Sequence, residues 1–511
     1  MSDKKLASAL ISVFYKDGLE PIVRRLLELG VRLYSTGGTQ AFIEGLGLEC
    51  TSVESVTGYP SILGGRVKTL HPKVFGGILA RRDLEQDMAH IGAYEIPLLD
   101  LVIVDLYPFE ETVKSTNDAA AIIEKIDIGG VSLIRAAAKN FQDVTIVASR
   151  NQYAGLLDLL NQNNGSTTLD QRRQFAASAF AECAHYDVAI ADYFNAGTGF
   201  RISNESGTPL RYGENPHQSA SFYGDIDALF EKLNGKELSF NNLVDTDAAC
   251  QLIAEWSEGG SLQASGNAVF AVIKHTNVCG IAERSTLDEA WEAALAGDRE
   301  SAFGGVLICN QDINLSVAEK INTIFFEILI APGYSPEALE LLKTKKNRML
   351  LRQKEPLRIS REYKRILNGT LVQDPDRTNY ANWQEEGARP CTAQEAADLK
   401  FANIVCKHLK SNAIAIVKDA QLIGKGCGQT SRIDALRQSL DKARQAGFST
   451  HGAVLASDAF FPFDDCVRMA HEAGITGVIQ PGGSVRDGDS IAFCKSNDMA
   501  MVLSGNRHFR H

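Results

Sequence analysis

The sequence predicts an α/β protein made of two main parts. Short apolar runs rich in β-branched residues alternate with longer helical patterns along all 511 residues, for example at 101–106, 144–148 and 269–273. Runs of this length, bounded by turn residues, are typical of buried and mostly parallel strands. Residues 196–209 are rich in Gly, Ser, Thr and Asn and lack apolar periodicity, so we predict a linker there.

Further strands are expected in chain order from the same signal. The first is residues 6–14, the second is 31–34, and later ones are 305–309, 328–331, 413–417 and 477–480. A polar stretch at 374–389 suggests that the C-terminal part is divided into two lobes. Ligands of open α/β sheets bind beyond the carboxyl ends of the strands, so the loops that follow these runs are the first places to look for function.

Composition excludes several classes of partner. There are 52 Lys and Arg against 63 Asp and Glu, a net charge of −11, which disfavours binding to a nucleic-acid polymer. No apolar run is long enough to span a bilayer, and the short apolar stretch near the start is broken by Tyr15, Lys16 and Asp17, unlike a signal peptide. The ten cysteines are scattered without a CxxC pair, as in a reducing compartment. We therefore predict a cytoplasmic protein with no membrane partner.

Four polar loops stand out in the first 200 residues. Their sequences are STGGT at 35–39, GGRVKTLHP at 64–72, DLYPF at 105–109 and DIGGVSLIRAAAKN at 127–140. Gly-rich turns at helix starts, hydroxyl groups and cations together suit a phosphate or another oxyanion. Each loop taken alone is also explained by a tight turn, a Ser/Thr cap or a solvated basic turn.

These motifs, in this order, resemble the inosine-monophosphate cyclohydrolase domain of the bifunctional purine-biosynthesis enzymes. The resemblance covers residues 1–200 and implies a methylglyoxal-synthase-like α/β fold. It implies that Lys68, Tyr107, Asp127 and Lys139 carry out the ring closure. Our hypothesis for their roles is that Lys139 exchanges protons with Asp127, while Lys68 and Tyr107 position and polarise the formamide. It also implies a nucleotide site made of Phe14, Tyr15, Lys16, Thr36, Gly37, Gly38, Thr39, Arg66, Val67, Thr69, Val104, Asp105 and Ile128.

A second set of motifs begins after the predicted linker. It comprises RYGENPHQ at 211–218, KHTNVCG at 274–280, SAFGG at 301–305, KSNAI at 410–414, GQTSR at 428–432, SDAFFPF at 457–463 and QPGGS at 480–484. Lys274 and His275 directly follow a predicted buried strand, which would place a proton acceptor and a cation at its carboxyl end. A lone histidine there is more often a packed, hydrogen-bonded residue, and the neighbouring Lys274 and Asn277 shift the balance towards function.

In this order the motifs resemble the AICAR transformylase half of the same enzymes, over residues 205–511. The resemblance implies a duplicated cytidine-deaminase-like α/β domain, 10-formyltetrahydrofolate as co-substrate, His275 as proton acceptor and Lys274 as the stabiliser of the transition state. It implies an AICAR site of Arg211, Tyr212, Asn242, Gly304, Glu327, Asn412, Arg432, Phe460 and Arg507, and a folate site of Ile433, Asp465, Ser484 and Val485. It further implies a homodimer. The zinc ligands of true deaminases, HxE with PCxxC, are missing from the sequence, so we predict no catalytic metal.

The chain departs from the family pattern at a few positions. Asn is common in the family where Asp105 stands, His where Phe75 and Phe141 stand, Pro where Val278 stands and Arg where Asp464 stands. None is a proposed catalytic residue, but Asp105, Val278 and Asp464 put nucleotide contacts, loop rigidity and folate affinity in question. Two alternatives stay open: an enzyme in which one half has lost activity, and a nucleotide-binding regulatory protein without turnover.

Overall fold

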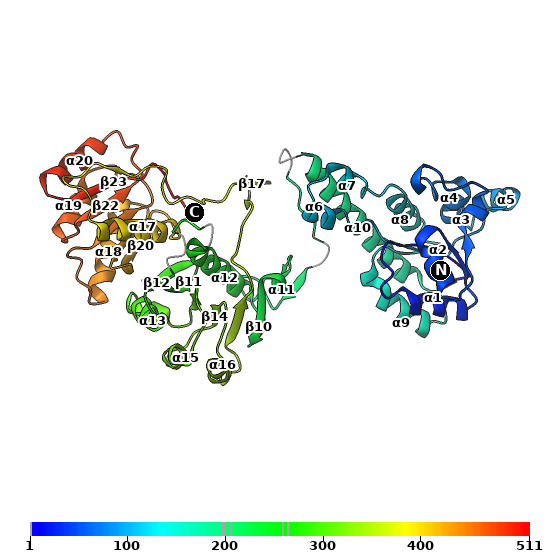
Figure 1. Cartoon of the computed structure of the whole chain (residues 1–511), viewed down its shortest axis with the longest axis horizontal. Coiled ribbons are helices and arrows are strands. Elements are labelled where there is room, and N and C mark those ends of the chain that lie inside the picture. The colour runs from blue at the N-terminus through cyan, green and yellow to red at the C-terminus, as the bar shows by residue number, and fades with distance from the viewer. Residues whose placement is uncertain (1–2, 196–199, 205–206, 258–259, 263–265) are drawn as a thin grey trace. The chain divides into compact units, whose positions relative to one another are not determined.

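The computed structural model describes residues 3–195, 200–204, 207–257, 260–262 and 266–511 (Figure 1). The chain divides into two compact units, Met1–Ser206 and Gly207–His511, which are described here separately. Of the predicted linker, residues 196–199 and 205–206 lie outside the described part. At its end the prediction is wrong, because Thr208 and Pro209 belong to strand β8 (Thr208–Leu210), which pairs with β9 (Ala220–Phe222).

The first unit is built on a fully parallel sheet of five strands in the order β4-β3-β2-β5-β6. These strands are β2 (Ser8–Ser12), β3 (Arg32–Ser35), β4 (Thr51–Ser52), β5 (Leu101–Val104) and β6 (Thr145–Val147). The strands predicted near residues 6–14, 31–34, 101–106 and 144–148 are confirmed; the second is shifted by one residue and the other three are shorter than predicted. A small antiparallel pair, β1 (Lys4–Lys5) with β7 (Ser166–Thr167), lies apart from this sheet.

Helices cover both faces of the five-stranded sheet. One core packs α1 (Leu19–Glu28), α2 (Gly37–Gly45) and α9 (Tyr153–Gln162) against it. The other core packs α3 (Val53–Thr57), α4 (Pro72–Leu79), α8 (Gly129–Lys139) and α10 (Leu169–Asn195). The remaining helices of this unit are η1 (Leu63–Gly65), α5 (Glu85–Ala93), α6 (Phe109–Ser115), α7 (Ala119–Ile123) and η2 (Arg150–Gln152).

The second unit contains one sheet of twelve strands, in the order β10-β15-β14-β13-β11-β12-β20-β19-β21-β22-β23-β18. Its first lobe supplies β10 (Phe230–Asn234), β11 (Ala268–Lys274), β12 (Asn277–Arg284), β13 (Val306–Cys309), β14 (Ile328–Ala331) and β15 (Met349–Gln353). Its second lobe supplies β18 (Gln384–Glu385), β19 (Ile414–Lys418), β20 (Gln421–Gly426), β21 (Val454–Ser457), β22 (Gly477–Gln480) and β23 (Ala500–Leu503).

The two lobes repeat one arrangement. In each, a helix precedes an antiparallel hairpin, β11–β12 or β19–β20, and three further strands follow in the same order on the far side of the first hairpin strand. Each hairpin also has a register shift at an equivalent place, between Val272 and Ile273 and between Ile416 and Val417. The lobes join where β12 pairs antiparallel with β20, so the sheet runs on from one lobe into the other.

The prediction of mostly parallel strands is wrong for the centre of this sheet. The strands β11, β12, β19 and β20 pair antiparallel, and only the outer groups β13-β14-β15 and β21-β22-β23 are parallel. The physical reason is that helices bury both faces here, so antiparallel strands become as uniformly apolar as parallel ones.

One core runs beneath both lobes. It packs α12 (Phe240–Ile253) and α17 (Ala393–Lys407) on the same face of the sheet. The opposite face carries two separate cores, with α13 (Leu287–Ala296), α15 (Leu315–Ile321) and α16 (Pro336–Lys343) in the first lobe and α18 (Arg432–Gln445), α19 (Asp465–Glu472) and α20 (Asp487–Ser496) in the second. The remaining elements are α11 (Ile226–Leu229), η3 (Ala254–Trp256), α14 (Arg299–Ala302), β16 (Glu362–Ile366) and β17 (Gly369–Gln373). In the described part of the chain, no helix has the length and apolar character needed to cross a membrane.

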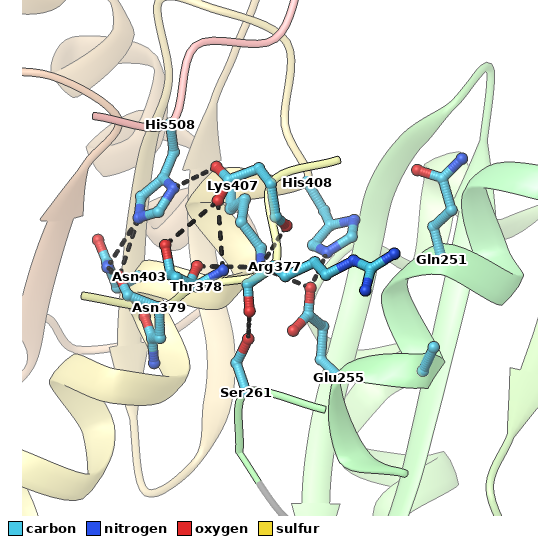
Figure 2. A network of polar contacts seen from close by, with 12 residues as sticks. Gln251, Glu255, Ser261, Arg377, Thr378, Asn379, Asn403, Lys407, His408 and His508 are labelled. Atoms are coloured by element: carbon cyan, nitrogen blue, oxygen red, sulfur yellow. Dashed lines mark hydrogen bonds and ion pairs between the residues drawn. The ribbon is translucent and has the colours of Figure 1, made fainter. Parts of the chain in front are cut away.

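A buried polar network ties the lobes together (Figure 2). Glu255, at the end of the first lobe's α12–η3 segment, accepts hydrogen bonds from Lys407 Nζ (2.7 Å) and His408 Nε2 (2.9 Å) of the second lobe. Burial lowers the pKa of His408 to about 4, although the hydrogen bond to Glu255 opposes this. Burial alone would raise the pKa of Glu255, but the hydrogen bond and charge of His408, together with Lys407, bring it to about 2. The carboxylate of Glu255 is therefore compensated in the interior, as a buried charge requires.

Candidate active sites

The first unit has a cavity of about 540 Å³ at the carboxyl edge of its parallel sheet. Phe14 and Lys16 follow β2, Thr36 to Thr39 follow β3, and Asp105 and Tyr107 follow β5, so three neighbouring strands deliver residues to the same place. Two other segments close the cavity, the loop carrying Arg66, Lys68 and Thr69 and the start of α8. Of the predicted residues, the cavity lining contains Phe14, Lys16, Thr36, Gly37, Gly38, Thr39, Arg66, Lys68, Thr69, Val104, Asp105, Tyr107, Asp127 and Ile128.

Two helices point their amino termini at this cavity. α2 begins at Gly37 and α8 begins at Gly129, and both starting residues line it. Helix amino termini carry unsatisfied N–H groups and partial positive charge, which suits an anion. The hydroxyl of Thr36 is buried and has no hydrogen-bond partner among the described residues, which leaves a donor for a ligand.

Glycines let Lys68 reach the cavity. A Cβ atom on Gly65 would lie 2.6 Å from Cε of Lys68, and one on Gly37 would lie 2.9 Å from its Nζ. Both glycines also have positive φ, 86° and 56°, a region that other residues adopt only with strain. The lysine side chain therefore runs between two backbone segments where glycine avoids both the close contact and the strain.

Burial gives the acidic groups of the cavity unusual protonation behaviour. It raises the pKa of Asp127, against hydrogen bonds from backbone N–H groups such as that of Gly130 (2.6 Å). Burial also raises the pKa of Tyr107, and the negative charge of Asp127 adds to the effect. A carboxyl group with a raised pKa takes up a proton more readily than an exposed one, as a general base must.

Asp105 has a contact that accounts for its position. Its carboxylate accepts hydrogen bonds from the backbone N–H groups of Phe14 and, at 3.0 Å, Tyr15, which fixes the loop after β2. Burial raises the pKa of Asp105 against these bonds, and burial lowers the pKa of the neighbouring Lys16. The residue thus shapes the cavity wall.

Three predicted residues do not line this cavity. Lys139 is the exposed last residue of α8, whereas Asp127 lies just before its first, which at 1.5 Å per residue separates them by roughly 18 Å. The expected proton exchange between Lys139 and Asp127 therefore has no direct contact within this chain. Tyr15 lines a neighbouring cavity of about 370 Å³ and donates to Glu111 at 3.0 Å. Val67 lies in the Lys68 loop, outside the lining.

Sequence reasoning missed Tyr186 in this unit. Its hydroxyl accepts a hydrogen bond from the backbone N–H of Asp127 (2.8 Å) and donates one to the carbonyl of Lys125 (2.6 Å). Tyr186 lies in the middle of α10, where an isolated tyrosine gives no signal beyond core packing. The predicted residue Arg66 forms an exposed ion pair with Glu124, a residue that is not among the predicted ones.

In the second unit, the predicted residues lie at one edge of the twelve-stranded sheet. In the first lobe, antiparallel pairing places the carboxyl end of β11 beside the amino ends of β13 and β14. The junction of β12 with β20 continues this edge into the second lobe. There the edge consists of the amino end of β19 and the carboxyl ends of β21, β22 and β23. The expectation that site residues follow the carboxyl ends of strands is therefore wrong for Gly304 and Glu327, which precede β13 and β14. The reason is that β13 and β14 run antiparallel to β11, so their amino ends lie at this edge.

The predicted first-lobe residues include the tip of the β11–β12 hairpin. His275 is exposed at this tip, and Lys274 Nζ donates to the carbonyl of Phe303 at 2.8 Å. The buried Asn242 donates through Nδ2 to Glu327 Oε2 at 2.8 Å. Arg211 stacks on its neighbour Tyr212, with its guanidinium 4.6 Å from the ring centre.

The second-lobe residues surround Arg432 at the start of α18. Its guanidinium donates to Asn412 Oδ1 (3.1 Å), to the carbonyl of Phe460 (3.1 Å) and to Asp458 Oδ1 (2.6 Å). Asp458 is fully buried, and its other oxygen has no partner among the described residues, as is also true of Arg432 Nε. Asp458 lies in the SDAFFPF motif but is not among the predicted site residues, because its burial and its pairing with Arg432 are visible only in the structure.

The remaining predicted residues are at the surface of the second lobe. Val485 is fully exposed, Ser484 donates its N–H to Asp487 at 3.0 Å, and Arg507 stacks on Phe509 at 4.4 Å. Ile433 and Asp465 are half-buried at the starts of α18 and α19. Asp464, the departure from the family pattern, pairs with Arg468 at 2.5 Å, while Val278 is buried in β12. Within the described residues, no group of three or more His, Cys, Asp or Glu side chains is placed to hold a metal ion.

The fold and these polar sites define a two-unit α/β enzyme, and comparison with known proteins gives its family. A model described as AICARFT/IMPCHase bienzyme matches residues 137–442, and one described as MGS-like domain matches residues 18–132. The curated "Bifunctional purine biosynthesis protein PurH" of Bacteroides thetaiotaomicron is 55% identical over 512 residues, which are 99% of each chain. Proteins of the same name are 45% identical in Chloroflexus aurantiacus, over 100% of each chain, and 45% identical in Synechocystis sp., over 98% of this chain and 99% of that one.

The chain therefore belongs to the AICARFT/IMPCHase bienzyme family. This confirms the family that the sequence motifs indicate and the predicted α/β fold class with a methylglyoxal-synthase-like N-terminal domain.

Proposed function

We propose that the second unit transfers a formyl group from 10-formyltetrahydrofolate to AICAR, and that the first unit closes the product's ring to give IMP. The observation that carries this proposal is the convergence of Lys68, Tyr107 and Asp127 on one cavity in a chain that aligns over 99% of its length with a bifunctional purine-biosynthesis protein. The half-buried Lys274 and the exposed His275 at the other unit's sheet edge support the assignment of formyl transfer.

In the proposed ring closure, the carboxamide nitrogen attacks the formyl carbon and water is then lost. Lys68 and the hydroxyl of Tyr107 stabilise the negative charge that develops on the formyl oxygen. Asp127, whose pKa burial raises, takes the proton from the amide nitrogen and returns one to the departing oxygen. The amino termini of α2 and α8, with Thr36, bind the phosphate. A direct role for Lys139 stays a prediction, and unchanged cyclisation by Lys139→Met would remove it.

In the proposed formyl transfer, the amine of AICAR attacks the formyl carbon of the folate. A nitrogen–carbon bond forms, the bond between the formyl group and the folate nitrogen breaks, and that nitrogen regains a proton. His275 accepts the proton from the attacking amine, and Lys274 stabilises the oxyanion. Asn242, Glu327, Asn412 and Arg432 bind the nucleotide, since their polar groups lie at the same edge of the sheet as His275.

We further propose that the chain acts in the cytoplasm as a homodimer. Sedimentation velocity at micromolar concentration should give twice the mass of 55.6 kDa. A monomer that retains full formyl transfer would remove the dimer from the proposal.

One assay tests the whole scheme. Purified protein is mixed with AICAR and 10-formyltetrahydrofolate, and both tetrahydrofolate and IMP are measured. His275→Ala should abolish tetrahydrofolate release while formyl-AICAR supplied directly is still converted to IMP. A regulatory protein would instead bind the nucleotide with no turnover, and a half-active enzyme would yield only one of the two products.

A further inference from the structure

The backbone that carries His275 has an unfavourable conformation. His275 and Thr276 form the two-residue loop of the β11–β12 hairpin, and both have positive φ, 51° and 60°. Loops of this class favour Asn-Gly or Gly-Gly, because a side chain with a Cβ atom is strained in the left-handed region and a β-branched one such as Thr is strained most. The surrounding structure must therefore hold this loop in place.

Asp245 supplies that support. Its carboxylate accepts hydrogen bonds from both backbone N–H groups of the loop, from Thr276 at 2.7 Å and from His275 at 3.3 Å. Asp245 lies in α12, whose amino terminus is fixed by a capping box between Ser239 and Asn242 and whose buried face belongs to the core shared by the lobes. The carboxylate thus connects the proposed proton acceptor to a rigid helix.

The second lobe contains the same contact between a helix carboxylate and a hairpin loop, but its loop has no histidine. Asp398 of α17 accepts hydrogen bonds from the backbone N–H groups of Asp419 (2.9 Å) and Ala420 (2.7 Å), which form the β19–β20 loop with φ of 50° at both residues. This copy lies at the opposite edge of the sheet from His275, because the two hairpins point in opposite directions. The contact of Asp398 with its loop is therefore remote from the proposed active site, whereas the contact of Asp245 with its loop lies beside it.

We propose that Asp245 is a positioning residue for formyl transfer, which holds the backbone of His275 so that its imidazole faces the attacking amine. The inference rests on the proposed function of His275. It predicts a loss in kcat rather than in KM, because Asn242 and Arg432, which would bind the nucleotide, are held by other contacts.

The experiment compares Asp245→Ala with the matched variant Asp398→Ala. Each removes the carboxylate that supports one hairpin loop, but only the first loop carries the histidine. Misplacing a catalytic group by about an ångström costs on the order of a hundredfold in rate, so Asp245→Ala should lower kcat of formyl transfer by about ten- to a hundredfold with KM for AICAR unchanged. Asp398→Ala should retain near wild-type kcat, and both should retain cyclisation in the separate first unit.

A rescue variant separates positioning from general damage. In Asp245→Ala/Thr276→Gly, glycine adopts positive φ without strain at the more strained of the two positions, so the loop depends less on the carboxylate and part of the lost kcat should return. Folding is checked by tryptophan fluorescence, since all three tryptophans (Trp256, Trp291 and Trp383) belong to the second unit. If Asp245→Ala does not fold, Asp245→Asn, which can still accept one of the two hydrogen bonds, takes its place.

The outcomes distinguish this inference from the proposed function. A folded Asp245→Ala protein with wild-type kcat, or equal losses in the Asp245 and Asp398 variants, would overturn the positioning role. A glycine rescue that restores stability without kcat would overturn it too. Full formyl transfer by His275→Ala, measured in parallel, would instead refute the assignment of His275 as the base.

Discussion

Replacing Lys68 by methionine tests the cyclohydrolase site most directly. Methionine keeps an unbranched chain that can still run between Gly37 and Gly65, but it removes the ammonium group that reaches the cavity. Loss of one preorganised donor to a developing oxyanion costs on the order of 10²–10³ in kcat, or about 3–4 kcal/mol. Because Lys68 is only half-buried, solvent screens its charge, and we expect the lower end, about a hundredfold.

The assay follows conversion of formyl-AICAR to IMP by absorbance. Lys114→Met is the matched control, since Lys114 is exposed on α6 and lies outside the cavity. Formyl transfer, measured on the same preparations, is an internal control because it belongs to the other unit. A Lys68→Met protein that cyclises at the wild-type rate, or one that loses both activities together, would refute the reasoning.

Three further variants test other parts of the structure. Gly65→Ala should lower cyclisation at least about tenfold and spare formyl transfer, because its Cβ would displace Lys68 and its φ of 86° would be strained; wild-type cyclisation would contradict this. Arg432→Met should lower the urea stability of the second unit by about 3–5 kcal/mol, since it leaves the buried Asp458 unpaired, and adding Asp458→Asn should recover part of it; no recovery would argue against the ion pair as the cause. Burial lowers the pKa of His408 to about 4, whereas a histidine in the unfolded chain has a pKa of about 6.5. As pH falls, the unfolded chain is therefore protonated at this histidine before the folded one. The free energy of unfolding should fall by about 3 kcal/mol between about pH 6.5 and about pH 4. His408→Gln should flatten that part of the curve in urea unfolding followed by tryptophan fluorescence, and an unchanged slope would show that other groups cause it.

The sequence was sufficient to predict strands but not their directions. The strands near 101–106, 269–273 and 477–480 are where the apolar runs indicate, because a buried strand needs little besides apolar residues and bounding turns. Whether neighbours run parallel or antiparallel depends on connections and on which faces are covered. The reversed direction of β13 and β14 relative to β11 therefore had no local signal.

The candidate sites were predictable to the extent that their residues follow strands or begin helices. Thr36 to Thr39 and Tyr107 could be found because a parallel sheet gathers its carboxyl ends at one edge. Asp127 could be found because it lies just before the Gly-Gly pair at which α8 begins. Lys139 could not be placed from its motif, since a helix carries its last residue away from its first. Asp245 gave no signal at all, because its hydrogen bonds join residues 30 and 31 positions apart.

The continuous sheet of the second unit determines where this protein can be divided. A cut between Asn195 and Gly207 would sever no strand pairing within either sheet, so each half should be expressible alone. A cut near residue 380 would remove β20, the strand that pairs with β12, and would expose the apolar core in which α12 and α17 pack together. A bare strand edge beside exposed apolar surface recruits other chains, so either lobe made alone should aggregate. The smallest expressible piece with formyl-transfer activity is thus expected to be the whole of residues 207–511.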